Sequence, residues 1–132
     1  GPLGRGYFTD TIKAEADLAE SDVRRGKPRF RPEAIEQNKR IVEVLKDVAW
    51  RHGATTSQVA LAWVLAQGPD IVPIPGSRRP EHMAQNAEAA SLTLTDDDLA
   101  QLGALTADQP RSEDAGWINR DTPSIGGDDR RP

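Results

Sequence analysis

The residues best suited to chemistry follow a short apolar run, Ile71 to Ile74, which leads into a Pro-Gly pair. A hydroxyl and two guanidiniums come next, from Ser77, Arg78 and Arg79, and a helix-start signal follows at Pro80. An arginine binds phosphate through two parallel N–H donors, and the free N–H groups of a helix N-terminus also favour anions. This order of residues predicts a buried strand that delivers a phosphate-binding turn to a helix. A solvated surface loop is the alternative interpretation of a basic turn taken alone.

The helix after this turn is expected to run from Pro80 to Ala89 or Ala90. It carries two amide side chains, Gln85 and Asn86, about two turns from its start. At the pitch of an α-helix this distance is short enough for both amides to reach a ligand held by the turn.

Two helices are expected upstream of the strand. Apolar residues recur at three- and four-residue intervals over residues 32–52, which predicts an amphipathic helix with one face on a core. Gly53 suits the left-handed residue that often ends a helix. Thr55 and Gln58 have the spacing of a capping box for the second helix. Over residues 57–67 that helix is apolar on nearly every side, so we expect it to be buried on several faces.

The segment 71–74 is apolar at every position but Pro73, as in a strand of a parallel sheet covered by helices on both faces. Gly68-Pro69 ends the helix before it, and Trp63 on that helix is interpreted as core packing rather than as a ligand platform. A final helix is expected to begin at Thr95, where three aspartates, 96–98, favour the positive end of the helix dipole.

Two stretches lack such periodicity. Residues 10–31 are polar and irregular, and the individual arginines there are equally well explained as solvated charges. Residues 108–132 are rich in Gly, Pro, Asp and Arg, which predicts a flexible tail. Trp117 and Ile118 are the exception in that tail, and could dock on the body of the protein or on a partner.

Composition excludes several classes of protein and site. The chain has 132 residues, a net charge of −4 and no cysteine. The mixed charges argue against nucleic-acid binding, and the missing cysteines exclude disulfides and thiolate metal sites. No apolar stretch approaches the roughly 18 residues of a membrane span, and no signal-peptide pattern opens the chain. We therefore expect a cytoplasmic protein without a membrane segment or a metal site.

Three segments, in order, resemble parts of the aldo-keto reductase family. Residues 2–9 are similar to the loop after its seventh barrel strand, residues 56–67 to the helix before its eighth strand, and residues 70–79 to that strand and the turn after it. The resemblance covers roughly residues 2–107. It implies an α/β fold, the C-terminal portion of a (β/α)8 TIM barrel, mostly helical in the part present and with one clear strand near 71–74.

The resemblance divides the chain into residues 1–107, the C-terminal part of a barrel with its cofactor-binding loops, and the tail 108–132. A complete barrel needs about 200 to 250 residues, so this chain is expected to be a fragment of one. Gly1 is either native or a residue left by cleavage of an affinity tag, and the sequence from Pro2 onward is interpreted as native.

The family reduces aldehydes and ketones with a tyrosine supported by lysine, aspartate and histidine, and all four belong to the half upstream of this chain. Tyr7 falls in the cofactor loop, and neither His52 nor His82 matches the family histidine. No catalytic residue is therefore assigned, and the chain alone is expected to be inactive.

The cofactor residues of the family match positions in all three segments. Leu3, Gly4 and Gly6 correspond to the loop near the pyrophosphate, where Arg5 is either a further charge or solvent-facing. Gly76, Ser77 and Arg78 correspond to the turn around the adenosine 2′-phosphate, which implies NADP; Arg79 is equally well a solvated charge. His82 stands where many relatives have an arginine over the adenine. Gln85 and Asn86 correspond to the pair at the adenine edge.

The leading interpretation is thus an NADP-dependent reductase of small carbonyl compounds, represented by its cofactor-binding part. The alternative is a non-catalytic, cofactor-sensing or protein-binding module derived from the same family. A self-contained helical interaction domain would require the cofactor-like turns to be accidental. Surfaces shaped to meet the rest of a barrel would also favour homo-oligomers or other association.

Overall fold

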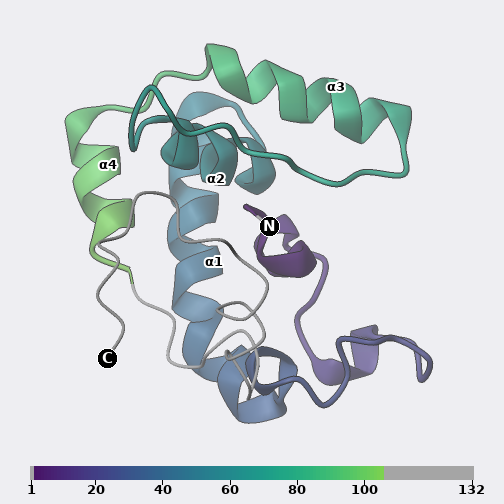
Figure 1. The fold of residues 1–132 in the computed structure, drawn as a ribbon. Helices are drawn as coiled ribbons and strands as arrows, with labels where there is room; N and C mark the ends of the chain where they lie inside the picture. The colour runs from purple at the N-terminus through teal and green to yellow at the C-terminus, as the bar shows by residue number, and fades with distance from the viewer. Residues whose placement is uncertain (1, 106–132) are drawn as a thin grey trace, which may run out of the picture.

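The computed structural model describes residues 2–105. This part of the chain is helical, with four α-helices joined by turns and short 3-10 helices (Figure 1). The α-helices are α1 (Pro32–His52), α2 (Thr56–Leu65), α3 (Pro80–Glu88) and α4 (Asp96–Gly103). The 3-10 helices are Gly4–Thr9, Glu15–Asp17, Pro28–Phe30 and Ala89–Ser91. The mostly helical character predicted from the sequence is confirmed for the described residues.

Helix α1 buries one apolar stripe, as its residue spacing predicts. It starts with a proline, where the missing N–H removes no helical hydrogen bond. It ends at Gly53, whose φ of 60° is left-handed and whose N–H donates to the carbonyls of Ala49 and Trp50. The buried stripe packs against α2 and α4. Its members in that core are Ile41, Leu45, Val48 and Ala49.

Helix α2 lies between the N-terminal segment and α3. Its predicted capping box is confirmed, because Thr55 Oγ1 accepts from the Gln58 N–H at 3.2 Å and Gln58 Oε1 accepts from the Thr55 N–H at 2.9 Å. Four consecutive residues, 59–62, are buried, so the helix is covered on more than one face. Trp63 packs half-buried against the same core, as expected. Helix α2 contacts α1, α3 and the 3-10 helix Gly4–Thr9.

The prediction of a strand at 71–74 is wrong for the part of the chain that the structure describes. Residues 71–77 form an irregular connection between α2 and α3, and no strand occurs within residues 2–105 (Figure 1). A strand exists through hydrogen bonds to a neighbouring strand, and this part of the chain supplies no neighbour. Val72 and Ile74 are instead 79% and 83% exposed, so the apolar run faces outward rather than into a sheet.

The polar stretch 10–31 is irregular, as predicted, yet it is anchored by a second apolar cluster. Tyr7, Leu18 and Phe30 are each only 2% exposed and pack with residues of α1. The Tyr7 hydroxyl donates to the carbonyl of Ile35 at 2.9 Å. This cluster fixes residues 10–31 and the 3-10 helix Gly4–Thr9 against the first half of α1.

Helices α3 and α4 follow the sequence-based expectations closely. Helix α3 continues into the 3-10 helix Ala89–Ser91, which matches the predicted end at residue 89 or 90. Helix α4 begins after Thr95, which forms a capping box with Asp98.

The flexible tail 108–132 and the docking of Trp117 and Ile118 lie outside the described residues. Within residues 2–105 no helix combines the length and the apolar character needed to cross a membrane.

Candidate functional site

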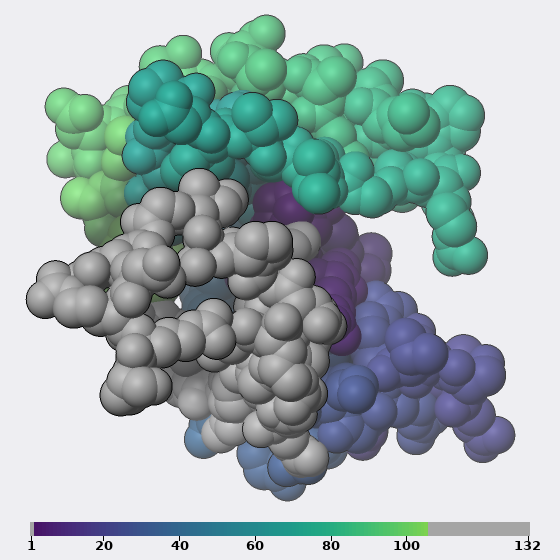
Figure 2. Space-filling view, viewed as in Figure 1, coloured from purple at the N-terminus to yellow at the C-terminus, as the bar shows by residue number. Residues whose placement is uncertain are grey.

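A polar cleft of about 730 Å³ gathers residues from three distant parts of the chain. Figure 2 shows the N-terminal segment, in purple, between the teal-to-green segment that carries α3 and the violet-blue segment of residues 10–31. Most of the residues singled out from the sequence line this cleft: Leu3, Gly76, Ser77, Arg78, His82, Gln85 and Asn86. Gly4 and Gly6 do not line it but follow Leu3 in the same loop.

The turn before α3 is shaped by Ser77. Its Oγ donates to the Arg79 carbonyl at 3.0 Å and accepts from the Arg79 N–H at 3.2 Å, which closes a tight local ring. Helix α3 then begins at Pro80 without any side-chain cap, and Glu81 is the acidic residue of its first turn. Within residues 2–105 the guanidiniums of Arg78 and Arg79 have no ion-pair partner, and both residues are exposed. The turn therefore presents positive charge beside uncapped helix N–H groups.

The loop at residues 3–6 bends sharply toward the same cleft. Leu3 has φ −93° and ψ 17°, and Gly4 follows with φ +57°. Leu3 lines the cleft, whereas Gly4 is buried and does not. Glycine is required at residue 4 for local reasons as well, because a Cβ there would lie 3.2 Å from the Phe8 ring.

The amide-bearing face of α3 is held in place by Gln58 of α2. Gln58 Nε2 donates to the Gln85 carbonyl and to Glu88 Oε2, each at 3.1 Å. This leaves the Gln85 side chain exposed at the cleft, with His82 also exposed and Asn86 half-buried beside it. Gln58 thus caps α2 and also positions α3. The capping pattern in the sequence predicts the first role but not the second.

Several cleft residues were not predicted as site residues. These are Thr9, Thr11, Arg24, Thr55, Thr56, Ser57 and Arg79. From the sequence alone, Arg79 and Arg24 are equally well explained as solvated surface charges. The hydroxyls of residues 55–57 lie at the start of α2, and the capping pattern explains Thr55 alone.

The tyrosine and one histidine are engaged in structural contacts. Burial raises the pKa of Tyr7, and its hydroxyl is committed to a backbone carbonyl. His52 Nε2 lies 2.7 Å from Asp98 Oδ2, and Arg51 donates to Asp98 Oδ1 at 2.7 Å. Burial acts to raise the pKa of Asp98, but hydrogen bonds from Arg51, His52 and Thr95 outweigh it and hold that pKa well below the usual carboxyl range.

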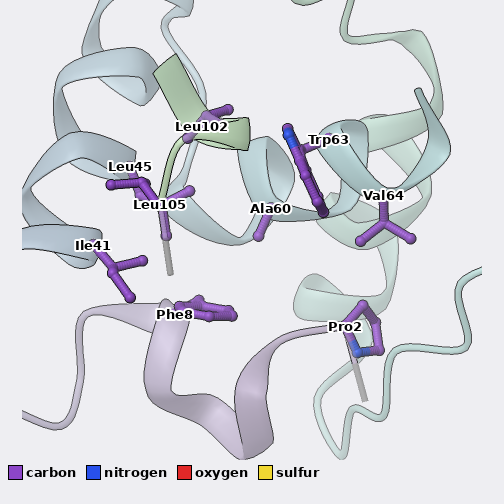
Figure 3. Close-up of a pocket in the computed structure, with 9 residues that line it drawn as sticks. All are labelled: Pro2, Phe8, Ile41, Leu45, Ala60, Trp63, Val64, Leu102 and Leu105. Carbon is purple, nitrogen blue, oxygen red and sulfur yellow. The ribbon is translucent and has the colours of Figure 1, made fainter. Parts of the chain in front are cut away.

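A second, apolar hollow of about 180 Å³ lies on another part of the surface. Figure 3 shows Phe8 and Pro2 on one side of it and residues of α1 and α2 on the other. Its remaining lining comes from Ile41, Leu45, Ala60, Trp63, Val64, Leu102 and Leu105. The indole N–H of Trp63 is buried without a hydrogen-bond partner among the described residues. The side chains that line this hollow are apolar, so it offers few groups for catalysis or for hydrogen bonds to a ligand.

Comparisons with known proteins agree on one family. The model of the "Aldo/keto reductase family" matches residues 1–107. The chain is 38% identical over 104 residues to "Aldo-keto reductase str7" of Strobilurus tenacellus, covering 79% of this chain and 31% of that protein.

Two further relatives give the same picture. "Aldo-keto reductase yakc [NADP(+)]" of Schizosaccharomyces pombe is 40% identical over 95 residues, covering 72% of this chain and 28% of that protein. "Probable aldo-keto reductase 1" of Glycine max is 41% identical over 101 residues, covering 76% of this chain and 29% of that protein. The chain thus spans less than a third of the length of these curated relatives.

Proposed function

Because the chain belongs to the aldo-keto reductase family, we propose that it is the cofactor-holding part of an NADP-dependent reductase of aldehydes or ketones. The observation that carries the proposal is the polar cleft, where the basic turn, the amides of α3 and the loop after Pro2 converge. One relative is itself named for NADP(+). Bound NADPH would supply the hydride and leave as NADP(+), and the residues of this chain would hold its adenosine and phosphate end.

The chemistry of the cleft suits such a group. Arg78 and Arg79 are cations without ion-pair partners in the described part of the chain, and a guanidinium pairs well with a phosphate dianion. The uncapped start of α3 adds backbone N–H donors beside them, and Ser77 shapes the turn that presents them. His82, Gln85 and Asn86 offer a ring to stack on and amides to pair with a purine edge. Leu3, Gly4 and Gly6 would approach the diphosphate through their backbone.

A cofactor with a 2′-phosphate accounts best for the two arginines. A cofactor without that phosphate would leave both guanidiniums facing a sugar hydroxyl. Since charged hydrogen bonds contribute more than neutral ones, NADP is the better ligand for this turn.

The proton donor for carbonyl reduction would come from outside this chain. Within residues 2–105 the one tyrosine is buried against Ile35, and His52 is paired with Asp98. His82 lines the cleft, but in this proposal it lies at the adenine end of the cofactor. A general acid must lie within hydrogen-bond reach of the group it protonates. We therefore expect the 132-residue chain to be inactive by itself and the complete native polypeptide to supply the acid. The substrate would be a small carbonyl compound, and the expected compartment is the cytoplasm.

Self-association is a further expectation of this proposal. The hollow around Phe8 and Trp63 and the outward-facing Val72 and Ile74 are apolar surfaces of a kind that mark interaction sites. In the complete polypeptide they would meet the remainder of the barrel. In the chain alone they would favour oligomers.

The test is a pair of assays on the complete native polypeptide and on the 132-residue chain. Fluorescence titration measures NADPH binding, and NADPH absorbance follows turnover with a broad set of aldehydes. We expect the complete polypeptide to bind NADPH and to turn over, and the chain to be silent in the turnover assay. Turnover by the chain alone would contradict the assignment of the catalytic acid to another region.

The alternative function is a non-catalytic, cofactor-sensing or protein-binding module. It is favoured by the lack of an unengaged tyrosine, the acid that the family uses, in residues 2–105. Binding of NADPH by the complete polypeptide without turnover of any aldehyde would select this alternative.

A further inference from the structure

The side chain of Arg24 is held from three sides at the edge of the polar cleft. Its Nε donates to Asp22 Oδ1 at 2.9 Å and its Nη2 to Asp22 Oδ2 at 2.7 Å, a two-point ion pair. The guanidinium also lies 5.9 Å from the centre of the Phe30 ring. Asp22 Oδ1 accepts from the Arg24 backbone N–H at 2.9 Å as well. Asp22 therefore shapes the turn and orients the guanidinium that follows it.

The remaining guanidinium nitrogen reaches the loop of residues 3–9. Arg24 Nη1 donates to the carbonyl of Arg5 at 2.9 Å, a contact across 19 residues of sequence. The N–H of the same peptide, on Gly6, donates to the Leu3 carbonyl at 2.9 Å. This peptide is thus fixed at both ends, by Arg24 on one side and by Leu3 on the other.

The peptide between Arg5 and Gly6 joins two residues with left-handed backbone conformations. Arg5 has φ 58° and ψ 37°, a left-handed conformation that is uncommon for a residue with a side chain, and Gly6 has φ 89°. A Cβ on Gly6 would come within 3.0 Å of Arg24 Nη1. Glycine at this position therefore allows both the backbone conformation and the close approach of the guanidinium.

We propose that Asp22 and Arg24 act as a brace that positions the loop of residues 3–6 for the cofactor diphosphate. The inference rests on the proposed function for its ligand and deepens it by naming two positioning residues outside the three segments 2–9, 56–67 and 70–79. Strained loops persist only when their surroundings fix them. The buried Tyr7 holds the end of this loop, and the brace holds the Arg5–Gly6 peptide, because it joins that peptide to residues 10–31 and, through Phe30, to the second apolar cluster.

A brace and a simple charge effect predict opposite results at Asp22. If Arg24 acted only as a cation near the phosphates, Asp22→Asn would remove a competing negative charge and tighten NADPH binding. If Arg24 is a positioning residue, the same substitution releases its guanidinium and weakens binding. Arg24→Lys adds a second distinction, because lysine keeps the charge but lacks the fork that joins Asp22 to Arg5.

The experiment measures the NADPH Kd of the complete native polypeptide by fluorescence, with hydrogen–deuterium exchange of the amides of residues 4–9. We expect Asp22→Asn and Arg24→Lys each to raise the Kd roughly tenfold and to speed exchange in the loop. Asp22→Glu keeps the carboxylate and should restore most of the affinity. Arg25→Lys is the matched control, since Arg25 donates to the Leu18 carbonyl and does not line the cleft.

Each outcome decides a separate point. Tighter binding by Asp22→Asn, or unchanged affinity and exchange in Arg24→Lys, would overturn the brace. A wild-type protein that binds no NADPH would contradict the proposed function instead. The exchange measurement would then still test the brace, because the loop should loosen in both variants with or without cofactor. Circular dichroism of each variant confirms that the helices remain folded.

Discussion

The starts of helices α3 and α4 are built in opposite ways. Helix α4 opens with a complete capping box, and its Asp98 also accepts hydrogen bonds from Arg51 and His52 of α1. Helix α3 opens with Pro80 and no side-chain cap, and the arginines before it have no ion-pair partner within residues 2–105. In α4 the chain satisfies its own polar groups, whereas in α3 it leaves donors and positive charge facing a cleft.

We interpret the start of α4 as contributing to stability and the start of α3 as contributing to ligand binding. A helix start that is fully satisfied gains nothing from a ligand, and its residues contribute to folding. A helix start with open donors contributes little to folding and can bind an anion. Substitutions at α4 should therefore change stability and leave cofactor affinity unchanged, and substitutions at the α3 turn should do the reverse.

The largest expected effect is the loss of stability in Asp98→Ala. The substitution removes the carboxylate half of the α4 capping box and leaves His52 and the partly exposed Arg51 without their carboxylate. It should lower the free energy of unfolding of the complete polypeptide by about 2 to 4 kcal/mol in a urea titration. Asp96→Ala, in the same first turn but exposed, is the matched control and should have little effect. Equal losses of stability in Asp98→Ala and Asp96→Ala would show that the capping box and the ion pairs of Asp98 do not stabilise the start of α4.

The next effect separates two glycines of the proposed cofactor site. Gly4→Ala places a side chain on a residue with φ +57° and 3.2 Å from the Phe8 ring, and should cost about 1 to 3 kcal/mol of stability. Gly76→Ala meets no atom within 4 Å and has no left-handed φ, so unfolding should be unchanged. Thermal and urea unfolding of both variants provide the measurement. A destabilised Gly76→Ala would show that the α3 turn is structural after all.

The smallest expected effect is that of pH on the brace. The hydrogen bonds from Arg24 lower the pKa of Asp22 to about 2. A depressed carboxyl pKa stabilises the folded state above the unfolded value, near 3.9, and this contribution is lost as pH falls toward the folded value. Exchange protection of residues 4–9 should therefore stay constant from pH 9 to about pH 5 and decline only below about pH 4. A carboxyl titration of Asp22 by NMR near its ordinary value would contradict the ion pair.

The helices could be predicted because their signals are local. The capping box at Thr55, the helix start at Thr95 and the left-handed Gly53 each depend on residues within one turn of the chain, and the structure confirms them. The strand at 71–74 could not be predicted correctly from local residues, because a strand needs a neighbouring strand and residues 2–105 contain none. The apolar side chains of this segment are exposed instead.

The cleft shows the same limit at the level of single residues. The family pattern predicted the turn at Gly76 to Arg78 and the amides of α3 as site residues, and these residues line one cleft. It gave no sign of Arg24, because the contact between Arg24 and Arg5 spans 19 residues and follows no helical or strand period. Charged residues in irregular loops acquire their role from tertiary contacts, so the sequence offers a solvated loop as an equally good explanation.

The central claim is that the α3 turn binds the 2′-phosphate of NADP. The most direct test titrates NADPH and NADH into the complete native polypeptide, the Arg78→Ala variant and the Lys39→Ala control, whose exposed charge lies on α1 outside the cleft. Removing one charged contact to a phosphate should weaken NADPH about ten- to a hundredfold in Arg78→Ala and leave NADH within about twofold. Lys39→Ala should change neither affinity. Equal weakening of NADPH and NADH by Arg78→Ala would contradict the claim.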